Sequence, residues 1–274
     1  MYKYKYIYFY NIMTKYESAY ILSHNGLGDN ITMIGAINFL LLHYNNIYLL
    51  CKDKYESNLK LLINNNNVFT IPFKERNEKN VYVEKDECKK IINNIHSNNY
   101  IDIFICGEHK SYLKSKITNP AILNYEKINK YDFNWGHIKR FYDDMRLDST
   151  IYYDYFDIIS TEESIKLYEK IKNLNIIFCH TQSSTKTISL PDNIKQYLND
   201  DNYIVVCANE NAYDKKHKYF ELAINYVNIP LQHYIDIIKN ACDFFLIDSC
   251  FSCIVHPLSV SNKLNTPKLE IYSR

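Results

Sequence analysis

Residues 17–43 read ESAYILSHNGLGDNITMIGAINFLLLH, and this stretch decides the predicted fold. Its first part, residues 18–23, is short, apolar and β-prone, as in a buried parallel strand. A glycine-bearing turn follows, and Asp29 then stands where a helix N-cap is expected, ahead of isoleucines at helical spacing. The stretch therefore predicts a strand, a tight loop and a helix. Such a unit opens an α/β domain and places its loop where open parallel sheets bind ligands.

Two interpretations of this loop compete. Gly26 and Gly28 form the first half of a dinucleotide-binding fingerprint, and Asp53 lies near the position of the ribose-binding acid. However, Ile31 replaces the third glycine, and the Asp29 carboxylate would occupy the helix amides and repel a phosphate. The loop therefore favours presenting a carboxylate over binding a pyrophosphate. A purely structural role for Asp29, as a helix cap, stays open at this point.

The motif at residues 23–40, GLGD followed by an amphipathic helix, resembles the N-terminal motif of heptosyltransferase-like glycosyltransferases (glycosyltransferase family 9). This resemblance implies two Rossmann-like α/β domains with parallel sheets facing a central cleft, the GT-B fold. In that family the aspartate after the glycines is the proposed general base, which implies that role for Asp29. The neighbouring loop residues would lie on the acceptor side: His24, Asn25, Gly26 and Gly28.

Length and charge restrict the class of protein. A chain of 274 residues fits two modest α/β domains or one large one. Its 32 basic and 31 acidic residues give a net charge of +1, which offers no electrostatic case for nucleic acid or an anionic membrane as the main partner. Residues 1–15 lack the uninterrupted apolar core of a signal peptide, and no window is long enough to span a membrane. We therefore expect a cytoplasmic protein with a short N-terminal extension.

The cysteine pattern favours reduced structural thiols. Four of the eight cysteines end predicted apolar strands: Cys51, Cys106, Cys179 and Cys207. Only Cys250 and Cys253 have the spacing of a metal or redox pair, with His256 three residues further on. Because no second pair accompanies them, we expect no metal site and no cofactor.

The first half of the chain alternates strands with helices. Strands are predicted at residues 47–51, 68–73 and 101–106, and helices at 55–63 and 87–97. His109 follows the last of these strands, so we expect it on the same rim as Asn25 and Asp29, either contacting an acceptor or as a solvated loop residue. Residues 119–157 are aromatic-rich and aperiodic and include Trp135. They would either line an acceptor cleft or cover the sheet.

A capping box at residues 160–163 starts a helix to about residue 173. We place the domain boundary in this region, near residues 158–174. The predicted units are an extension at 1–16, an acceptor domain at 17–160 and a nucleotide-sugar domain at 161–274.

The loop at residues 180–186 follows a predicted strand at 175–179 and is rich in hydroxyls, with one lysine. A diphosphate needs several hydrogen-bond donors and partial charge neutralisation, which such a loop supplies, although turns are commonly rich in Ser and Thr. The loop is similar to the donor-nucleotide loop of heptosyltransferases, with Leu190-Pro191 where that family has Trp-Pro. The resemblance implies donor binding by Ser183, Ser184 and Lys186.

The last part of the chain resembles the C-terminal signature of the same family. A strand at 203–207 leads to Glu210, a predicted nucleoside contact, and a helix at 231–242 and a strand at 244–247 lead to Asp248 and Ser249. Asp248 is implied as a donor-binding residue, and Ser249 and the following amides would donate to phosphate oxygens. Two residues depart from the pattern, because Cys250 replaces the usual glycine and Cys253 the usual histidine. The final segment, 262–274, is also shorter than the family's closing helices.

The sequence therefore predicts a glycosyltransferase that is inverting and metal-independent, with a nucleotide-sugar donor and an unknown glycan or small-molecule acceptor. The departures at Cys250 and Cys253 favour one alternative, a non-catalytic GT-B-fold binding module. An NAD-dependent oxidoreductase is a third hypothesis, which rests on the partial glycine fingerprint.

Overall fold

The computed structural model describes residues 15–96, 101–126, 136–264 and 270–272. Nearly all of the predicted N-terminal extension, Trp135 and much of the final segment lie outside these ranges. Within the described part of the chain, no helix is both long enough and apolar enough to cross a membrane.

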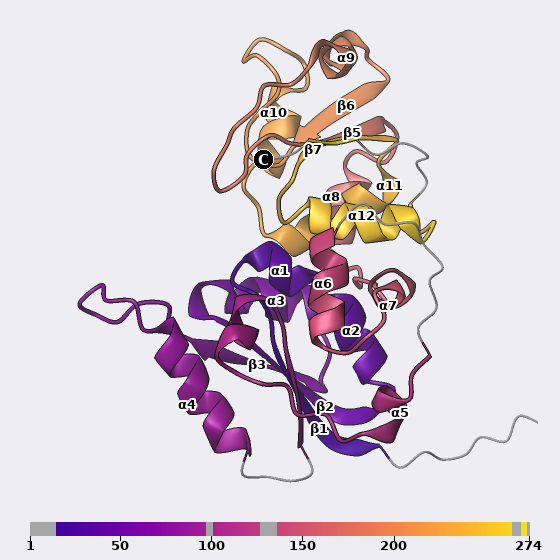
Figure 1. The fold of residues 1–274 in the computed structure, drawn as a ribbon. Helices are drawn as coiled ribbons and strands as arrows, with labels where there is room; N and C mark the ends of the chain where they lie inside the picture. Colours follow the sequence, from indigo (N-terminus) through magenta and orange to yellow (C-terminus); the bar gives the residue numbers. More distant parts are fainter. Residues whose placement is uncertain (1–14, 97–100, 127–135, 265–269, 273–274) are drawn as a thin grey trace, which may run out of the picture.

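Two four-stranded parallel sheets form the framework of the molecule (Figure 1). The first has the strand order β3-β2-β1-β4, built from β1 (Tyr16–Leu22), β2 (Tyr44–Lys52), β3 (Val68–Phe73) and β4 (Ile101–Ile105). The second has the order β6-β5-β7-β8, built from β5 (Asn175–His180), β6 (Tyr203–Cys207), β7 (Asp243–Ile247) and β8 (Glu270–Tyr272). The predicted fold class, two Rossmann-like parallel sheets facing a cleft as in GT-B proteins, is therefore confirmed. We call the parts built on these sheets the N-terminal and C-terminal lobes.

The first strand of each sheet has neighbours on both sides. In the N-terminal lobe, β1 pairs with β2 and β4, and in the C-terminal lobe β5 pairs with β6 and β7. The chain thus leaves β1 and β5 in one direction and later returns to their other side. This change of direction opens a crevice at the carboxyl ends of the central strands, where α/β sheets bind ligands.

Short helices connect the strands. The N-terminal lobe contains α1 (Leu27–Ile31), α2 (Met33–Leu40), α3 (Glu56–Ile63), α4 (Glu84–His96), α5 (Pro120–Leu123), α6 (Gly136–Asp144) and α7 (Thr150–Asp154). The C-terminal lobe contains α8 (Glu162–Glu169), α9 (Asp192–Lys195), α10 (Phe220–Ala223), α11 (Ile235–Asn240) and α12 (Ser252–Val260). Two 3-10 helices matter below, η2 (Gly107–Ser111) and η5 (Leu231–Tyr234). The aperiodic segment at 119–157 contains α5, α6 and α7, which are too short to show a clear helical period.

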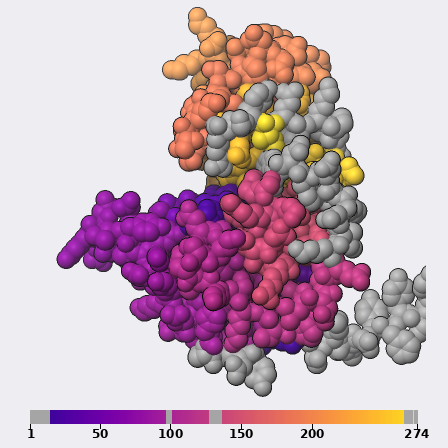
Figure 2. Space-filling view, viewed as in Figure 1, coloured from indigo at the N-terminus to yellow at the C-terminus, as the bar shows by residue number. Residues whose placement is uncertain are grey.

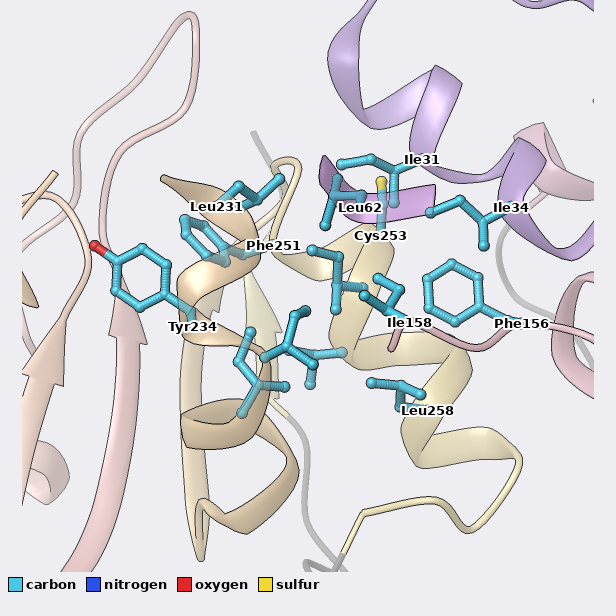
Figure 3. Close-up of a cluster of buried hydrophobic side chains, with 14 of the residues drawn as sticks. Ile31, Ile34, Leu62, Phe156, Ile158, Leu231, Tyr234, Phe251, Cys253 and Leu258 are labelled. Carbon is cyan, nitrogen blue, oxygen red and sulfur yellow. The ribbon is translucent and has the colours of Figure 1, made fainter. Parts of the chain in front are cut away.

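The two lobes share one hydrophobic core. Helix α12 contacts α1 and α7, and α3 contacts η5, so elements of both lobes meet directly. Side chains from the two lobes interleave at this junction (Figure 3): Ile31, Ile34, Leu62, Phe156, Leu231, Phe251, Cys253 and Leu258. In the space-filling view the orange-to-yellow C-terminal lobe sits on the indigo-to-magenta N-terminal lobe (Figure 2). This shared core holds the carboxyl ends of both sheets close to one another.

Candidate active site

A cavity of about 620 Å³ lies between the two lobes. Its wall combines residues that follow β1, β2, β5 and β7 with residues of α6. A volume of several hundred Å³ is typical of small-molecule sites, and the carboxyl ends of parallel strands are where such sites form. The cavity is therefore the candidate active site.

Asp29 lines this cavity from the N-terminal lobe. The helix it belongs to begins one turn earlier than predicted, with Gly26 as the N-cap and Asp29 as the third helical residue. The N–H of Gly26 donates to Oδ2 of Asp29 at 2.8 Å, which closes the first turn of α1. Asp29 thus stabilises the helix start and also lines the cavity, so its position is compatible with both roles that the sequence left open. This bond also occupies an amide that a dinucleotide pyrophosphate would need.

The loop before Asp29 is tied to the segment after β4. The backbone N–H of Glu108 donates to Nδ1 of His24 at 2.9 Å, and Nδ2 of Asn25 donates to Oε2 of Glu108 at 2.7 Å. His24 lines the cavity and its ring packs against Phe141, with ring centroids 5.3 Å apart. Of the predicted acceptor-side residues, the structure thus brings His24, Gly26 and Gly28 into the cavity wall, with Asn25 bonded just behind it.

His109 does not lie on the rim. The residue is 1% exposed and its ring packs edge-on against Phe73, with Nδ1 hydrogen-bonded to the hydroxyl of Tyr112. Burial lowers the pKa of His109 to about 4, so the ring is neutral near pH 7. The expectation of a cleft-facing or solvated residue was wrong because η2 turns the chain inward directly after β4.

The loop after β5 contributes only part of the predicted donor set. Ser183 and Ser184 line the cavity, whereas Lys186 is exposed and outside the described wall. The loop closes on itself, because the N–H of Ser183 donates to the carbonyl of Lys186 at 2.8 Å and the N–H of Lys186 donates to Oγ of Ser183 at 3.1 Å. This turn keeps the two serines in the cavity wall, and Lys186 is an exposed residue of the same loop.

Asp248 and Ser249 line the cavity at the end of β7. The hydroxyl of Ser249 is 2.9 Å from Nδ1 of His180, and its backbone N–H donates to Oγ of Ser252 at 2.9 Å. Burial lowers the pKa of His180 to about 4, so this ring is also neutral near pH 7. Of the polar groups of Ser249, the hydroxyl is therefore the one that can reach a ligand.

A second cavity of about 600 Å³ adjoins the first. The two share wall residues, among them His180 and Gln182, and the second continues along the C-terminal lobe past Asn209 and η5. Glu210 is outside its described wall. Its carboxylate accepts a hydrogen bond from Oγ1 of Thr181 at 2.8 Å, and its neighbour Asn209 lines the cavity instead.

Three wall residues that the sequence did not single out come from α6: His137, Arg140 and Phe141. This helix buries Ile138, Phe141 and Tyr142 and turns Arg140 toward solvent and the cavity. Among the described residues that line the cavity, Arg140 is the only Lys or Arg. The sequence does show Arg140 as a basic residue on the polar face of an amphipathic helix. It does not show which loop that face lies against.

Cys250 and Cys253 lie where the lobes touch. A Cβ atom on Gly28 would lie 3.1 Å from Sγ of Cys253 and 3.7 Å from Cα of Cys250, so only glycine fits there without a shift. His256, one turn further along α12, is hydrogen-bonded to the hydroxyl of Tyr153 at 3.2 Å and does not line the cavity. The described residues contain no group of three or more His, Cys, Asp or Glu side chains arranged as metal ligands.

Comparison with known proteins places this fold. No family model and no curated protein sequence matches the chain. Among solved structures, a glycosyl transferase family 9 protein from Veillonella parvula DSM 2008 is similar, with a TM-score of 0.56 and 14% identity over 94% of this chain and 87% of that one. The ADP-heptose LPS heptosyltransferase II of E. coli is similar with a TM-score of 0.52 and 13% identity over 93% of this chain and 84% of that one. The fold is therefore that of the family which the sequence motifs resemble.

Proposed function

We propose that the protein is a glycosyltransferase that moves a sugar from a nucleotide-sugar donor to an acceptor hydroxyl. The observation that carries this proposal is that Asp29 of one lobe faces the same cavity as Ser183, Ser184 and Ser249 of the other. An acid and a group of hydroxyl donors on opposite sides of one cleft suit a displacement at a sugar carbon. The fold supports the proposal, since one protein that shares it is named an ADP-heptose heptosyltransferase.

The donor would bind against the C-terminal lobe. Its nucleoside fits the second cavity, whose wall joins the apolar Ile229, Pro230 and Leu231 to the polar Asn209. Its diphosphate would extend into the first cavity toward the start of α12, where the helix dipole favours negative charge. Asp248 would then act on the turn that carries Ser249, because the Ser252 hydroxyl lies 2.6 Å from the Ser249 carbonyl oxygen and 3.2 Å from Oδ1 of Asp248. Glu210 would act indirectly, through its bond to Thr181.

Ser249 needs a free proton to donate to a phosphate oxygen. Its neighbour His180 is neutral near pH 7, so one ring nitrogen carries a proton and the other accepts. If Nδ1 of His180 donates to Oγ of Ser249 across their 2.9 Å contact, the serine proton is available for the ligand. The proposal assigns this tautomer to His180.

Positive charge near the leaving group would come first from Arg140. Arg140 lines the cavity, and a planar guanidinium matches a phosphate better than a single ammonium does. Lys186, an exposed residue of the loop that carries Ser183 and Ser184, is the second candidate.

The proposed reaction is a single displacement. The acceptor oxygen attacks the anomeric carbon as the bond from that carbon to the diphosphate breaks, and Asp29 takes the hydroxyl proton. The diphosphate leaves with the bonding electron pair and is stabilised by Arg140 and the serine hydroxyls. One displacement inverts the configuration at carbon, and these charges let it proceed without a metal. The acceptor, a glycan or small molecule, would lie against the loop from His24 to Gly28.

Two substitutions of Asp29 test this function. In Asp29→Asn the side-chain oxygen still accepts the Gly26 N–H, so α1 keeps its cap while the base is lost. We expect Asp29→Asn to lower turnover of a nucleotide sugar by at least about 100-fold, the usual contribution of a general base, with unchanged nucleoside diphosphate affinity. Asp29→Ala should lose the same activity and about 1 kcal/mol of stability in addition.

The second candidate is a binding module without turnover. Cys250 favours it, because a side chain stands in the cavity wall where the resembled signature has glycine. The measurement is a thermal-shift screen of nucleoside diphosphates and their sugars, followed by assay of every sugar nucleotide that stabilises the protein. If nucleotide sugars bind but neither free sugar nor nucleoside diphosphate is released, the protein is a binding module and not a transferase. Stabilisation by NAD alone would point to the oxidoreductase instead.

A further inference from the structure

We infer that His24 is a hydrogen-bond donor of fixed tautomer, which orients the acceptor oxygen beside Asp29. The inference rests on the proposed function for the identity of the acceptor, but the tautomer itself follows from geometry. It assigns His24 as a positioning residue that fixes the attacking group while Asp29 takes the proton.

The tautomer is set by the backbone. A backbone N–H can only donate, and the N–H of Glu108 points at Nδ1 of His24 across 2.9 Å. Nδ1 must therefore be the unprotonated nitrogen of the neutral ring, and the proton resides on Nε2. Because the hydrogen bond that one ring nitrogen makes decides which nitrogen of a histidine carries the proton, Nε2–H is the group available to the cavity.

The segment after β4 is shaped to receive this ring. Gly107 has a φ of +66°, a conformation that other residues rarely adopt, and a Cβ atom there would lie 2.1 Å from Nδ1 of His24. The N–H of Gly107 donates to Oδ2 of Asp144 at 3.0 Å, which anchors the segment to α6. On its other side the His24 ring rests on Phe141 of the same helix. We call Gly107, Glu108 and Phe141 the His24 seat.

The seat leaves one polar atom of the ring without a partner among the described residues, namely Nε2. His24 lines the cavity from the loop after β1 and Asp29 lines it from the first turn of α1, where one carboxylate oxygen of Asp29 accepts the Gly26 N–H. A fixed donor and a free carboxylate oxygen are complementary to a hydroxyl group, which accepts with its lone pairs and donates its proton. Holding the attacking oxygen in this way contributes through orientation rather than through added binding energy.

The tautomer can be measured without any ligand. Long-range proton–nitrogen NMR of the nitrogen-15-labelled protein distinguishes a protonated from an unprotonated ring nitrogen, and the His24 signals are assigned by their loss in His24→Asn. We expect an unprotonated Nδ1 and a protonated Nε2. A protonated Nδ1 overturns the inference. In Gly107→Ala, where the seat is displaced, the same signals should move or broaden.

Two substitutions separate the seat from the donor. Asparagine at position 24 can still accept the Glu108 N–H through its side-chain oxygen, but it has no group at the position of Nε2. Glutamine reaches that position with an amide N–H. With a nucleotide sugar that the parent protein hydrolyses, using water as acceptor, we expect His24→Asn to lower kcat at least about 10-fold at unchanged donor KM. His24→Gln should recover part of that loss.

These results distinguish the positioning role of His24 from the proposed transferase function. Equal kcat for His24→Asn and the parent overturns the positioning role, even if Asp29→Asn is inactive and the transferase proposal stands. A parent protein that turns over no nucleotide sugar overturns the proposed function and the acceptor role together. The NMR result then still decides whether the seat fixes the tautomer.

Discussion

At the scale of single residues, the charge in the cavity wall comes from α6. Arg140 lines the cavity from the N-terminal lobe, opposite the serines of the C-terminal lobe. The next residue back, Lys139, is exposed and forms an ion pair with Asp143 at 2.6 Å. Two adjacent cations therefore differ in whether they face the cavity, which provides a matched pair for mutagenesis.

We expect Arg140→Gln to weaken nucleoside diphosphate binding at least about 10-fold, because one charge-assisted hydrogen bond to phosphate is worth roughly 1.5–3 kcal/mol. Lys139→Gln should leave the Kd within about twofold, since its ion pair is on the surface. Isothermal titration calorimetry measures the Kd for nucleoside diphosphate in Arg140→Gln, Lys139→Gln and Lys186→Gln. A larger loss in Lys186→Gln than in Arg140→Gln would assign the charge to Lys186 instead.

At the scale of elements, α2 depends on a glycine for its packing. A Cβ atom on Gly35 would lie 2.8 Å from the carbonyl oxygen of Ile151 and 2.8 Å from Cα of Tyr152, both backbone atoms of the α7 segment. Backbone atoms cannot rotate away as a side chain does, so the two helices would have to separate. The close approach of α2 and α7 is therefore available only to glycine.

We expect Gly35→Ala to destabilise the protein by about 1–3 kcal/mol through overpacking, although alanine is the better helix former. Gly136→Ala is the control, because a Cβ atom there meets no atom of the described residues within 4 Å. That variant should be neutral or up to about 1 kcal/mol more stable. Urea unfolding of both variants tests the pair, and equal effects would contradict the packing argument.

The sequence allowed the regular elements to be predicted well. The strands at 68–73 and 203–207 match β3 and β6 at both ends, because each is a short β-prone run bounded by turn residues. The sequence also predicted Asp29, Ser183, Ser184 and Ser249 at strand ends, and all four line the cavity. Position after a parallel strand brought these residues to one edge of the molecule, since the carboxyl ends of parallel strands share that edge. It did not suffice for Lys186 and Glu210, which also follow strands and are outside the cavity wall.

Residues whose location depends on the tertiary packing of helices could not be predicted from the sequence. Arg140 reaches the cavity through the tertiary placement of α6, and His109 is turned inward by η2. The predicted N-cap was wrong, because Gly26 rather than Asp29 is the N-cap of α1. Asp29 lies within the first turn and its carboxylate accepts the Gly26 N–H. Local pattern does not encode these long-range or one-turn choices.

At the scale of the whole molecule, buried histidines link stability to pH. Burial lowers the pKa of His109, His180 and His256 to about 4 each, below the ordinary value of 6.5. Between pH 6.5 and 4 the unfolded chain binds protons that the folded protein does not. Stability contributed by the neutral rings is therefore complete above pH 6.5 and is lost as the pH falls through this window.

We expect the free energy of unfolding to fall from pH 6.5 to 4.5, with His109 contributing on the order of 2 kcal/mol over this window because its ring is almost fully buried. Urea titrations at several pH values measure this slope. His109→Gln should unfold with a slope smaller by about one proton. An unchanged slope in that variant would exclude His109 as a source of the pH dependence.

The shared core also predicts how the lobes move. Relative motion of two lobes is expected where their interface is small and polar, whereas here α1, α3, α7, α12 and η5 pack through apolar side chains (Figure 3). We therefore expect the arrangement of the cavity in this structure to be the one that binds ligand, without a large opening step.

A cross-link between the lobes tests this. A Cβ atom on Gly28 would lie 3.1 Å from Sγ of Cys253, close to the distance of about 3 Å that a disulfide requires, so Gly28→Cys should oxidise to a bond between α1 and α12. We expect the oxidised and reduced forms of this variant to bind nucleoside diphosphate with Kd values within about threefold, since the bond only fixes a contact already present. Calorimetry on both forms, with Gly28→Ser as the control for the added side chain, makes the comparison. Loss of binding on oxidation that dithiothreitol restores would mean that the lobes must separate for ligand to enter.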